Sequence, residues 1–411
     1  MMEIKKKKEL VPALRFGEFD GEWSISKIID LFTIKAGGDI DKKNVREKKD
    51  KEFKYPIYAN AKAKKGLYGY SNLYKANENV ITIAGRGVNI GITHARDHKF
   101  YPIVRLLVLA PKLDYDIYFF EHEINRLNVF IESTGVPQLT SPQISLYNVK
   151  YPSLPEQKKI ATFLSTVDQK IEQLRQKVSL LEQYKKGVLQ QIFSQEIRFK
   201  EENGEDFADW EVKRFDNVFA FIRTNSFSRS LLNYNSGEVK NIHYGDIHTK
   251  FSAQFDITKE NVPFVNEDVD ISKINKEDYC EEGDLIIADA SEDYADIGKS
   301  IEVVNLRNQK LVAGLHTYIA RPKIQMALGF SCYLMQNSQV RRAIMRIATG
   351  VSVLGITKTN LSKLEILIPC FPEQKKIATF LSSIDQKITQ TQEQLTQTQA
   401  FKKGLLQQLF V

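Results

Sequence analysis

Three short segments hold residues whose types and spacing could support enzymatic chemistry, and each of them is incomplete. Gly298-Lys299-Ser300 matches the end of a phosphate-binding loop, but Asp293 stands where that loop needs its first glycine. The segment 85–91, Gly-Arg-Gly-Val-Asn-Ile-Gly, has one residue too many for a dinucleotide-binding loop, and no long helical pattern follows it. His94 and His98 are four residues apart in a polar loop with no third ligand nearby, which argues against a metal site.

The sequence therefore predicts a chain with no catalytic residue, no metal site and no cofactor of its own. It contains no glycine-bounded serine of the nucleophile-elbow type and no Asn/Asp-Pro-Pro-aromatic segment, the usual catalytic loop of amino-methyltransferases. The three cysteines, Cys280, Cys332 and Cys370, form no Cys-x-x-Cys pair, which excludes a disulfide scaffold and a cysteine-rich zinc site. This cysteine usage, and the lack of an apolar run long enough to span a bilayer, predict a soluble, cytoplasmic protein with no membrane partner.

Polar and basic residues interleaved with aromatic residues follow the predicted strands in both halves of the chain. Arg and Asn can pair with guanine and adenine edges, Lys can hold phosphates, and Asp or Glu can accept from cytosine N4. Taken singly, such residues are more often solvated loop residues, and only their presence in both halves makes DNA binding a hypothesis. The candidate DNA-binding residues are Asn60, Lys62, Lys64, Lys65, Tyr68, Arg86, Asn89, His94 and Arg96 in the first half, and His243, Tyr244, Asp246, His248, Lys250, Ser291, Glu292 and Lys299 in the second.

The net charge of +7 conceals an asymmetry between the two halves. Residues 1–200 carry 34 Lys and Arg against 23 Asp and Glu, a balance of +11, whereas residues 201–411 carry 24 against 28, a balance of −4. A basic first half suggests a polyanionic partner, although a solvated basic surface explains it equally well. The stretch 260–296, with 13 acidic residues against two lysines, adds to the ambiguity, so charge alone does not decide.

An internal repeat sets the architecture of this 411-residue chain, whose length alone predicts two or three domains. Residues 154–193 align without a gap on 371–410, with 23 of the 40 positions identical. Weaker similarities precede each copy: an Arg-Phe pair followed by a Trp with a Phe nine residues later, and a Thr-Gly-Val at 134–136 and 349–351. The chain is therefore predicted to be two copies of one unit, each a globular segment followed by a long repeated segment.

The repeated segment is predicted to be a helix of about 38 residues, roughly 57 Å long at 1.5 Å per residue. Pro155 and Pro372 suit a first helical turn, and the Glu after each favours the positive end of the helix dipole. Apolar residues alternate spacings of four and three, which is a heptad seam, but Thr391 and Thr398 replace two leucines in the second copy. The predicted seam is Ile160, Leu164, Val167, Ile171, Leu174, Val178 and Leu181 in the first copy, and Ile377, Leu381, Ile384, Ile388 and Leu395 in the second. Because neither helix can bury its seam alone, we expect an antiparallel, pseudo-two-fold coiled coil within the chain, with a homodimeric coiled coil as the alternative.

The globular segments predict a mixed α+β fold of undecided topology. Their apolar runs predict strands at 80–84, 101–109, 285–288, 311–320 and 364–368 and a helix at 333–347. The predicted domains are a first globular domain at 1–153, a first long helix at 154–196, a second globular domain at 197–370 and a second long helix at 371–411.

Two dissimilar globular halves, each followed by a near-identical helix that opens Pro-Glu-Gln-Lys-Lys-Ile-Ala, resemble the DNA-specificity subunit of type I restriction-modification enzymes. The likeness covers nearly the whole chain and is most specific at 155–193 and 372–410, with Gly245-Asp246-Ile247, Gly135 and Gly350 as weaker support. The resemblance implies that each globular domain is a target-recognition domain for one half of a split site in double-stranded DNA. It also implies that the helices space these domains and dock methyltransferase subunits, two of them, with restriction/translocase subunits joining later. S-adenosylmethionine would then belong to the methyltransferase partner.

Elementary mechanics agrees with this resemblance, because a split site needs two readers held at a fixed separation. Two alternatives remain: a single-chain specificity subunit of another restriction class, with the same mechanics, and a coiled-coil adaptor without DNA binding. The adaptor would bind a partner protein and have negligible, salt-insensitive affinity for DNA.

Overall fold

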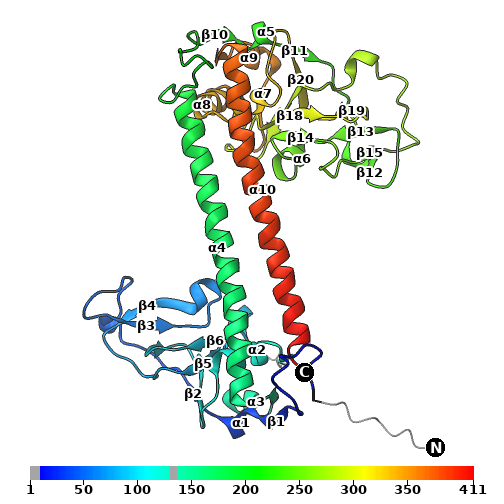
Figure 1. The fold of residues 1–411 in the computed structure, drawn as a ribbon. Coiled ribbons are helices and arrows are strands. Elements are labelled where there is room, and N and C mark those ends of the chain that lie inside the picture. Colours follow the sequence, from blue (N-terminus) through cyan, green and yellow to red (C-terminus); the bar gives the residue numbers. More distant parts are fainter. Residues whose placement is uncertain (1–9, 130–136) are drawn as a thin grey trace, which may run out of the picture. The chain divides into compact units, whose positions relative to one another are not determined.

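The computed structural model describes residues 10–129 and 137–411 (Figure 1). The chain divides into two compact units, one made of Met1–Arg175 and Glu393–Val411 and the other of Gln176–Gln392. Each unit therefore holds one globular domain together with parts of two long helices, α4 (Leu154–Phe193) and α10 (Phe371–Gln408). The Thr-Gly-Val at 134–136 lies outside the described residues.

Two small sheets and a closing ribbon build the first globular domain. One sheet has the strand order β2-β8-β5-β6, the other has the order β4-β3-β7, and β1 pairs antiparallel with β9. The run Val80-Ile-Thr-Ile83 is buried at every position, as expected for β-branched residues in a strand covered on both faces. The strands are β1 (Ser24–Lys27), β2 (Phe32–Ala36), β3 (Tyr55–Tyr58), β4 (Leu67–Ser71), β5 (Val80–Ile83), β6 (Thr93–Arg96), β7 (Tyr101–Pro102), β8 (Leu107–Pro111) and β9 (Asn148–Tyr151), and the helices are α1 (Ile28–Leu31), α2 (Ile117–Asn125) and α3 (Ser141–Ser145).

The second globular domain repeats this frame and enlarges it. Its sheets have the orders β11-β20-β16-β18-β14 and β12-β15-β13-β19, with the ribbons β10-β22 and β17-β21. The strands are β10 (Glu211–Arg214), β11 (Phe219–Ile222), β12 (Leu232–Asn233), β13 (Val239–Ile242), β14 (Gln254–Asp256), β15 (Phe264–Val265), β16 (Leu285–Ala288), β17 (Ala290–Ser291), β18 (Ser300–Asn305), β19 (Lys310–Ala313), β20 (Thr317–Pro322), β21 (Leu354–Gly355) and β22 (Glu365–Ile368). The helices are α5 (Phe215–Val218), α6 (Tyr244–Thr249), α7 (Phe330–Gln336), α8 (Ser338–Ile347) and α9 (Lys358–Ser362). The predicted mixed α+β fold with two globular domains is confirmed.

Turns break two predicted strands and one predicted helix. The strand expected at 101–109 is β7 and β8, separated by Val104 (φ 53°) and Arg105 (φ 56°), and the strand expected at 311–320 is β19 and β20, separated near His316 (φ 57°). The helix expected at 333–347 is broken at Asn337, whose side chain accepts from the backbone N–H of Gln339 and caps α8. Apolar residues flank the two strand breaks closely, whereas the helix break lies in the polar run Gln336-Asn337-Ser338-Gln339, in which Asn337 serves as the N-cap.

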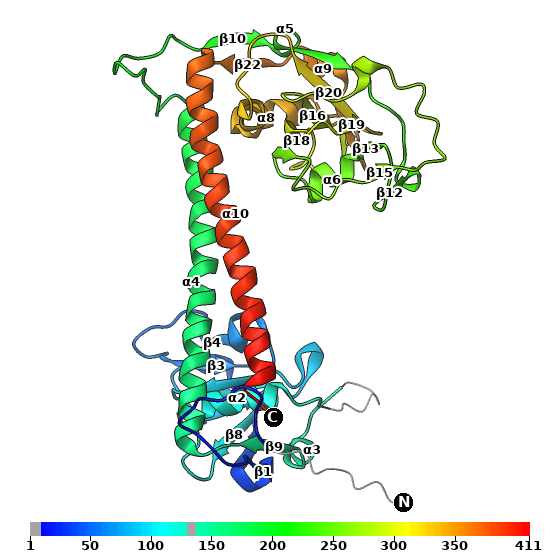
Figure 2. The ribbon, with the colours of Figure 1, turned by 45° about the vertical axis from the view of Figure 1, so that its right-hand side comes forward.

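Segments of α4 and α10 pack antiparallel in each unit (Figures 1 and 2). In the first unit Lys402 Nζ lies 2.6 and 2.7 Å from the carboxylate oxygens of Asp168, and in the second unit Lys185 Nζ lies 2.6 Å from Asp385 Oδ1. The repeat aligns Asp168 with Asp385 and Lys185 with Lys402, so each helix gives the acid to one pair and the lysine to the other. This reciprocity confirms the predicted antiparallel, pseudo-two-fold packing within one chain.

Thr391 sits in the helix seam although its side chain is polar. It is 3% exposed, and its hydroxyl donates to the carbonyl of Lys387 at 2.7 Å. Thr398 makes the same bond to the carbonyl of Gln394. Because each hydroxyl is satisfied by its own helix, the second copy tolerates threonine where the first has leucine.

A buried glutamate ties the first turn of each long helix to its globular domain. Glu156 accepts two hydrogen bonds from Arg15, at 2.9 and 2.7 Å, and one from Trp23 Nε1 at 3.4 Å. Glu373 repeats this arrangement with Arg198, at 3.2 and 2.8 Å, and with Trp210 Nε1 at 2.9 Å. The hydrogen bond to Glu156 raises the pKa of Arg15, and that to Glu373 raises the pKa of Arg198.

The glutamine after each of these glutamates binds two more segments of the same domain. Gln157 donates to the carbonyl of Pro152 and accepts from the N–H of Asp116, the N-cap of α2. Gln374 donates to the carbonyl of Pro369 and accepts from the N–H of Ala327, just before α7. The polar residues of the repeated Pro-Glu-Gln motif therefore hold the fold together.

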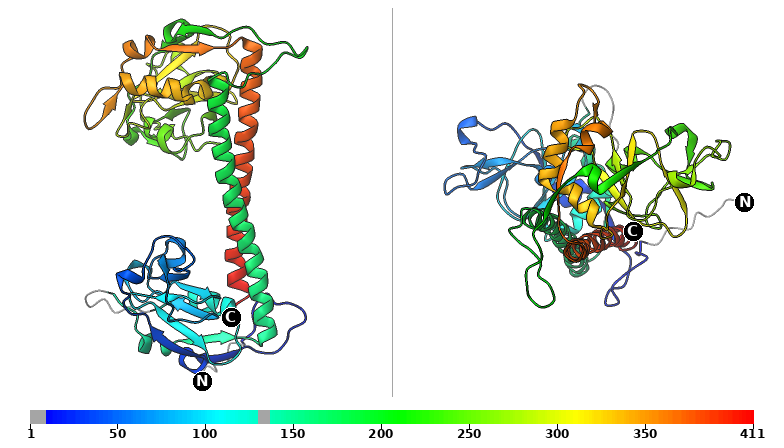
Figure 3. Two further views of the ribbon diagram at one scale, coloured as in Figure 1. Left: turned by 90° about the vertical axis from the view of Figure 1, so that its left-hand side faces the viewer. Right: turned by 90° about the horizontal axis from the view of Figure 1, so that it is seen from above.

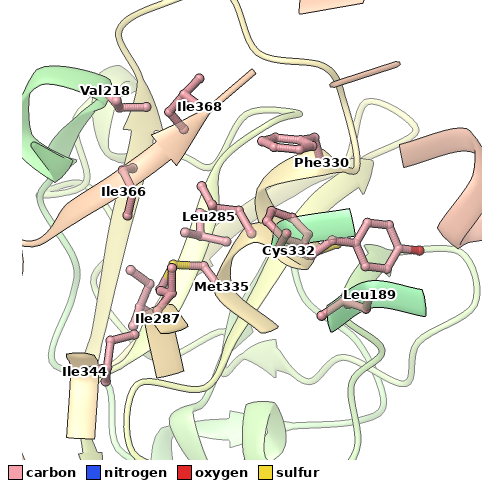
Figure 4. Close-up of a cluster of buried hydrophobic side chains, with 14 of the residues drawn as sticks. Leu189, Val218, Leu285, Ile287, Phe330, Cys332, Met335, Ile344, Ile366 and Ile368 are labelled. Atoms are coloured by element: carbon pink, nitrogen blue, oxygen red, sulfur yellow. The ribbon is translucent and has the colours of Figure 1, made fainter. Parts of the chain in front are cut away.

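The last turn of the other long helix docks on the same domain (Figure 3). Phe410, near the end of α10, stacks on Phe119 with ring centroids 5.1 Å apart and contacts Trp23 at 6.0 Å. At the end of α4, Phe193 contacts Trp210 at 5.8 Å and Phe330 at 6.0 Å. In the second unit, Phe193, Trp210 and Phe330 belong to one large apolar core. This core also contains Leu189 of α4 and the strand and helix residues drawn in Figure 4.

We expect Arg198→Ala to destabilise the second unit strongly. Glu373 has no exposed surface, and the variant leaves its carboxylate with only Trp210 as a side-chain donor. Breaking a buried ion pair by removing one partner costs about 3–5 kcal/mol, so the free energy of unfolding should fall by about that amount. Denaturant unfolding of the full chain measures it. The control is Arg214→Ala, which removes an exposed pair with Asp216 and should cost far less; equal losses for both variants contradict this role of Glu373.

Candidate nucleic-acid interface

The loop between β3 and β4 presents the three candidate lysines of the first domain to solvent. Lys62, Lys64 and Lys65 are exposed, and the backbone is left-handed at Lys64 (φ 48°) and Lys65 (φ 52°). Gly66 continues the turn at φ 86°, where a Cβ would come 2.6 Å from the carbonyl oxygen of Ala59. Within the described residues no ion pair neutralises these lysines, so the turn is an exposed cluster of positive charge suited to phosphates.

Arg96 lies beneath this turn and not on the surface. It is 3% exposed, its guanidinium lies 3.6 Å from the ring centroid of Tyr58, and it donates to Thr82 Oγ1 at 3.0 Å and to the carbonyl of Lys65 at 2.6 Å. Burial lowers the pKa of Arg96. A side chain buried in this way has no surface to offer to DNA, and its observed role is to hold the lysine turn.

Asn60 is also committed to the structure, because it joins three loops. Its Oδ1 accepts from the N–H of Gly85 at 2.9 Å, and its Nδ2 donates to the carbonyl of Val104 at 2.6 Å. Its own carbonyl accepts from Asn89 Nδ2 at 3.1 Å. The lysine loop, the loop after β5 and the turn before β8 are thus held together, with Asn60 and Asn89 as the connectors.

The remaining candidates of the first domain differ in whether their side chains are exposed or already hydrogen-bonded within the domain. Tyr68 is largely exposed. Arg86 donates to Gln138 Oε1 at 3.2 Å, and its Nε is buried without a partner among the described residues. His94 Nδ1 lies 3.4 Å from Glu121 Oε1, and its Nε2 is likewise buried without a partner. Only Tyr68 and the lysines therefore lie fully open to a ligand.

In the second domain, Asp246 is the buried centre of an ion-pair cluster. Arg229 binds its two carboxylate oxygens at 2.7 and 2.9 Å, and Lys250 lies 2.9 Å away. Burial raises the pKa of Asp246, but the hydrogen bonds from Arg229 and Lys250 outweigh it and hold that pKa below its usual value. The carboxylate is therefore occupied inside the domain, whereas Lys250 and Arg229 are partly exposed on its outer side.

Three histidines surround Tyr244 at the start of α6. Its ring lies 4.7 Å from His243, 6.1 Å from His248 and 5.4 Å from His316. His243 Nδ1 accepts from the N–H of Gly245, and burial lowers the pKa of His243. His248 Nε2 lies 3.0 Å from the carbonyl of Ala290, so α6 is tied to the loop after β16.

That loop contains the last three candidates of the second domain. Ser291 is buried, and its hydroxyl accepts from the N–H of Asp293. Lys299 donates to the carbonyl of His248 at 2.6 Å, and Glu292 is exposed. The structure thus brings α6 and the loop after β16 together, while the DNA contacts proposed for the individual side chains stay predictions.

Sequence reasoning missed two exposed basic residues beside these loops. Arg105 precedes β8 in the turn that Asn60 holds, and His316 precedes β20 and contacts Tyr244. Both lie inside runs that are predicted to be single strands, so neither is assigned to a loop. Val88, in the loop after β5, is also fully exposed.

Within residues 10–129 and 137–411, no group of three or more His, Cys, Asp or Glu side chains could hold a metal ion. In the same part of the chain, no helix is both long and apolar enough to cross a membrane. The prediction that the chain carries no cofactor of its own stays a prediction.

Two solved structures resemble the fold along nearly its whole length. The S subunit of a type I restriction-modification system from M. genitalium has a TM-score of 0.62 at 15% identity, covering 97% of this chain and 99% of that chain. A chain from a study of complex assembly and conformational transition of the type I R-M system has a TM-score of 0.52 at 13% identity, covering 94% and 96%. At these identities the likeness concerns the fold.

Sequence comparisons find relatives of this chain among type I specificity subunits. The MjaVIII specificity subunit of Methanocaldococcus jannaschii is 25% identical over 348 residues, covering 80% of this chain and 78% of that protein. Two putative type I specificity subunits of Mycoplasma pneumoniae are each 33% identical, but these matches span only 39% and 35% of those proteins and 35% and 29% of this chain. A family model described as the type I restriction modification DNA specificity domain matches residues 20–183 and 208–398. Because these two ranges cover most of both repeats, the chain belongs to the family of type I restriction-modification DNA specificity domains.

Proposed function

We propose that this chain recognises a bipartite target in double-stranded DNA, with each globular domain binding one half. The observation that carries the proposal is that one strand frame occurs twice while its loops differ. β2-β8-β5-β6 corresponds to β11-β20-β16-β18, and the parallel pair β3-β7 corresponds to β13-β19. Two domains that share the same strand arrangement but differ in their loop side chains are suited to bind two different half-sites.

The loop chemistry supports different ways of binding in the two domains. The first domain offers Lys62, Lys64 and Lys65 on one turn, which suits phosphates. The second domain offers histidines and a tyrosine around α6, beside the Asp246 ion-pair cluster. The charge balances of +11 and −4 for the two halves agree with this difference. Phosphate contacts therefore contribute more to affinity in the first half than in the second.

The long helices, by this proposal, dock two methyltransferase subunits. Tyr184 on α4 and Phe401 on α10 are the same position of the repeat, and both are more than half exposed. Each lies in the last quarter of its helix, and exposed aromatic side chains are typical anchors of protein interfaces. Since the anchor occurs twice in equivalent surroundings, it suits two copies of one partner.

The chain itself is proposed to be non-catalytic, with S-adenosylmethionine bound by the methyltransferase partner and restriction/translocase subunits joining the assembly. A coiled-coil adaptor without DNA binding is the competing function. The exposed lysine turn favours the DNA-binding function, because an adaptor has no need of a strained turn that concentrates positive charge.

Exchange of one globular domain tests the proposal as a whole. Ser24 and Tyr151 are partners in the ribbon that closes the first domain, so residues 24–151 form an exchangeable block. Replacing them with the matching block of a relative should change one half of the recognised motif and leave the other intact. Genome-wide mapping of methylated motifs in cells that also express the cognate methyltransferase subunit measures this. A change in both halves, or the absence of any bipartite motif with the unmodified chain, contradicts the proposal.

Removing the lysine cluster tests the phosphate contacts. If Lys62, Lys64 and Lys65 each neutralise one phosphate, the triple alanine variant should bind every DNA sequence more weakly. The log–log salt dependence of its affinity should flatten by about 2.7, at about 0.9 per contact. The same substitutions at the exposed Lys42, Lys43 and Lys48 serve as the control and should alter the slope less. Equal slopes for the two triple variants and the unmodified chain would leave the turn without a role in binding.

Alanine at each helix anchor tests partner docking. Tyr184→Ala and Phe401→Ala should each remove one of two bound methyltransferase subunits, because a central aromatic anchor contributes about 2 kcal/mol or more, roughly thirtyfold in affinity. Lys186→Ala and Lys403→Ala are matched controls, since two residues further along is about 200° around the helix. Native mass spectrometry counts the subunits. Two subunits retained by the double variant Tyr184→Ala/Phe401→Ala would rule out this surface.

A further inference from the structure

In both globular domains, the same turn presents a basic residue whose backbone is left-handed. Arg105 (φ 56°) lies between β7 and β8, and His316 (φ 57°) lies between β19 and β20. An exposed apolar residue precedes each of them, Val104 in the first domain and Leu315 in the second. The sequences of the two turns have no residue in common, so only the structure relates them.

The strand register makes the two positions equivalent. Leu107, two residues after Arg105, pairs with Ile83 of β5, and Tyr318, two residues after His316, pairs with Ile287 of β16. Two residues beyond those partners, the carbonyls of Gly85 and Asp289 accept from the N–H groups of Leu139 and Ile356, respectively. Arg105 and His316 therefore lie at the same end of the same strand pair, next to the loops already described.

Keeping a side chain at these positions has an energetic cost. A non-glycine residue at φ near +57° costs of order 1–3 kcal/mol, which glycine would avoid. A side chain that is retained against this cost in both domains is one that the protein uses. Within the described residues the Arg105 guanidinium has no hydrogen-bond or ion-pair partner, so its use is not inside the domain.

Hydrogen bonds fix both turns in place, and a side chain that recognises a base edge needs such a fixed position. The N–H groups of Val104 and Arg105 donate to the carbonyls of Gly38 and Gly37 at 3.2 and 3.1 Å, and Asn60 holds the carbonyl of Val104. In the second domain His316 Nδ1 lies 3.2 Å from Asp289 Oδ1, and its ring contacts Tyr244. This leaves the planar guanidinium of Arg105 and the Nε2 of His316 free to make a directed hydrogen bond.

We propose that Arg105 and His316 are specificity-determining residues that read a base edge at equivalent places in the two half-sites. This rests on the bipartite DNA recognition proposed above. The Arg105 fork matches O6 and N7 of a guanine in the major groove, and His316 Nε2 makes a single hydrogen bond to a base edge. The neighbouring Val104 and Leu315 are suited to contact a thymine methyl group. The phosphates are left to the lysine turn.

Glycine substitutions test this without risk to the fold, because glycine suits the left-handed backbone better than the native residue. The variants are Arg105→Gly and His316→Gly in the full chain, with Arg307→Gly as the matched control. Arg307 is exposed and has φ 48°, but it lies in the turn after β18, at the opposite end of that strand from the loop after β16. Each chain is expressed with its cognate methyltransferase subunit for methylation mapping. The purified complexes are then titrated with duplexes that carry single base-pair changes, at several salt concentrations.

We expect Arg105→Gly to relax one position of one half-site, with roughly 5- to 150-fold loss of discrimination there, an unchanged salt slope and an unchanged second half-site. His316→Gly should do the same in the other half-site, and Arg307→Gly should change neither.

Equal weakening for all sequences with a slope reduced by about 0.9 would make Arg105 a phosphate contact and overturn the proposal. Unchanged specificity in both variants would overturn it as well, while the bipartite motif of the unmodified chain would still stand. If the unmodified chain directs methylation to no bipartite motif, the proposed function itself fails.

Discussion

The carboxylate of one glutamate in each repeat joins the first turn of the long helix to its globular domain. Glu156 and Glu373 are almost completely buried, so each must find donors inside the protein. The donors are an arginine and a tryptophan at the start of the globular domain, more than 130 residues away in sequence in the first copy. This contact places the start of the globular domain next to the domain's end and the first turn of the long helix. The β1-β9 and β10-β22 ribbons close over the same junctions.

Each domain is also attached to the far end of the other helix. The first unit contains the start of α4 and the end of α10, and the second unit contains the end of α4 and the start of α10. Phe410 and Phe193 fill the same place against Trp23 and Trp210, respectively. The antiparallel pairing follows from these attachments, and the reciprocal ion pairs of Asp168 with Lys402 and of Asp385 with Lys185 are consistent with it.

A frame held in this way leaves the loops free to differ. The identical residues of the repeat act inside the frame, as the hydrogen bonds of Gln157 and Gln374 illustrate. The loops at the strand ends differ in character between the copies, since one domain has a lysine turn there and the other has a histidine cluster. The same division occurs among the candidate site residues: Asn60, Arg96 and Asp246 support loops, whereas the exposed lysines remain available to a ligand.

The sequence by itself determined the duplicated architecture and the two long helices, because these depend on local periodicity and on near-identity over 40 positions, but it left packing within the chain and a homodimeric coiled coil both open. It also marked loops that hold candidate DNA-binding residues, since Lys, Arg, Asn and His near predicted strand ends are visible in one dimension. Only the tertiary structure decided which of those side chains face outward. Burial and hydrogen bonding depend on partners far away in sequence, as Arg96 under the lysine turn and Asn60 between three loops demonstrate. The left-handed turns at Arg105 and His316 escaped prediction for a related reason: apolar residues lie on both sides of each turn, and the backbone reversal depends on hydrogen bonds to distant strands and loops.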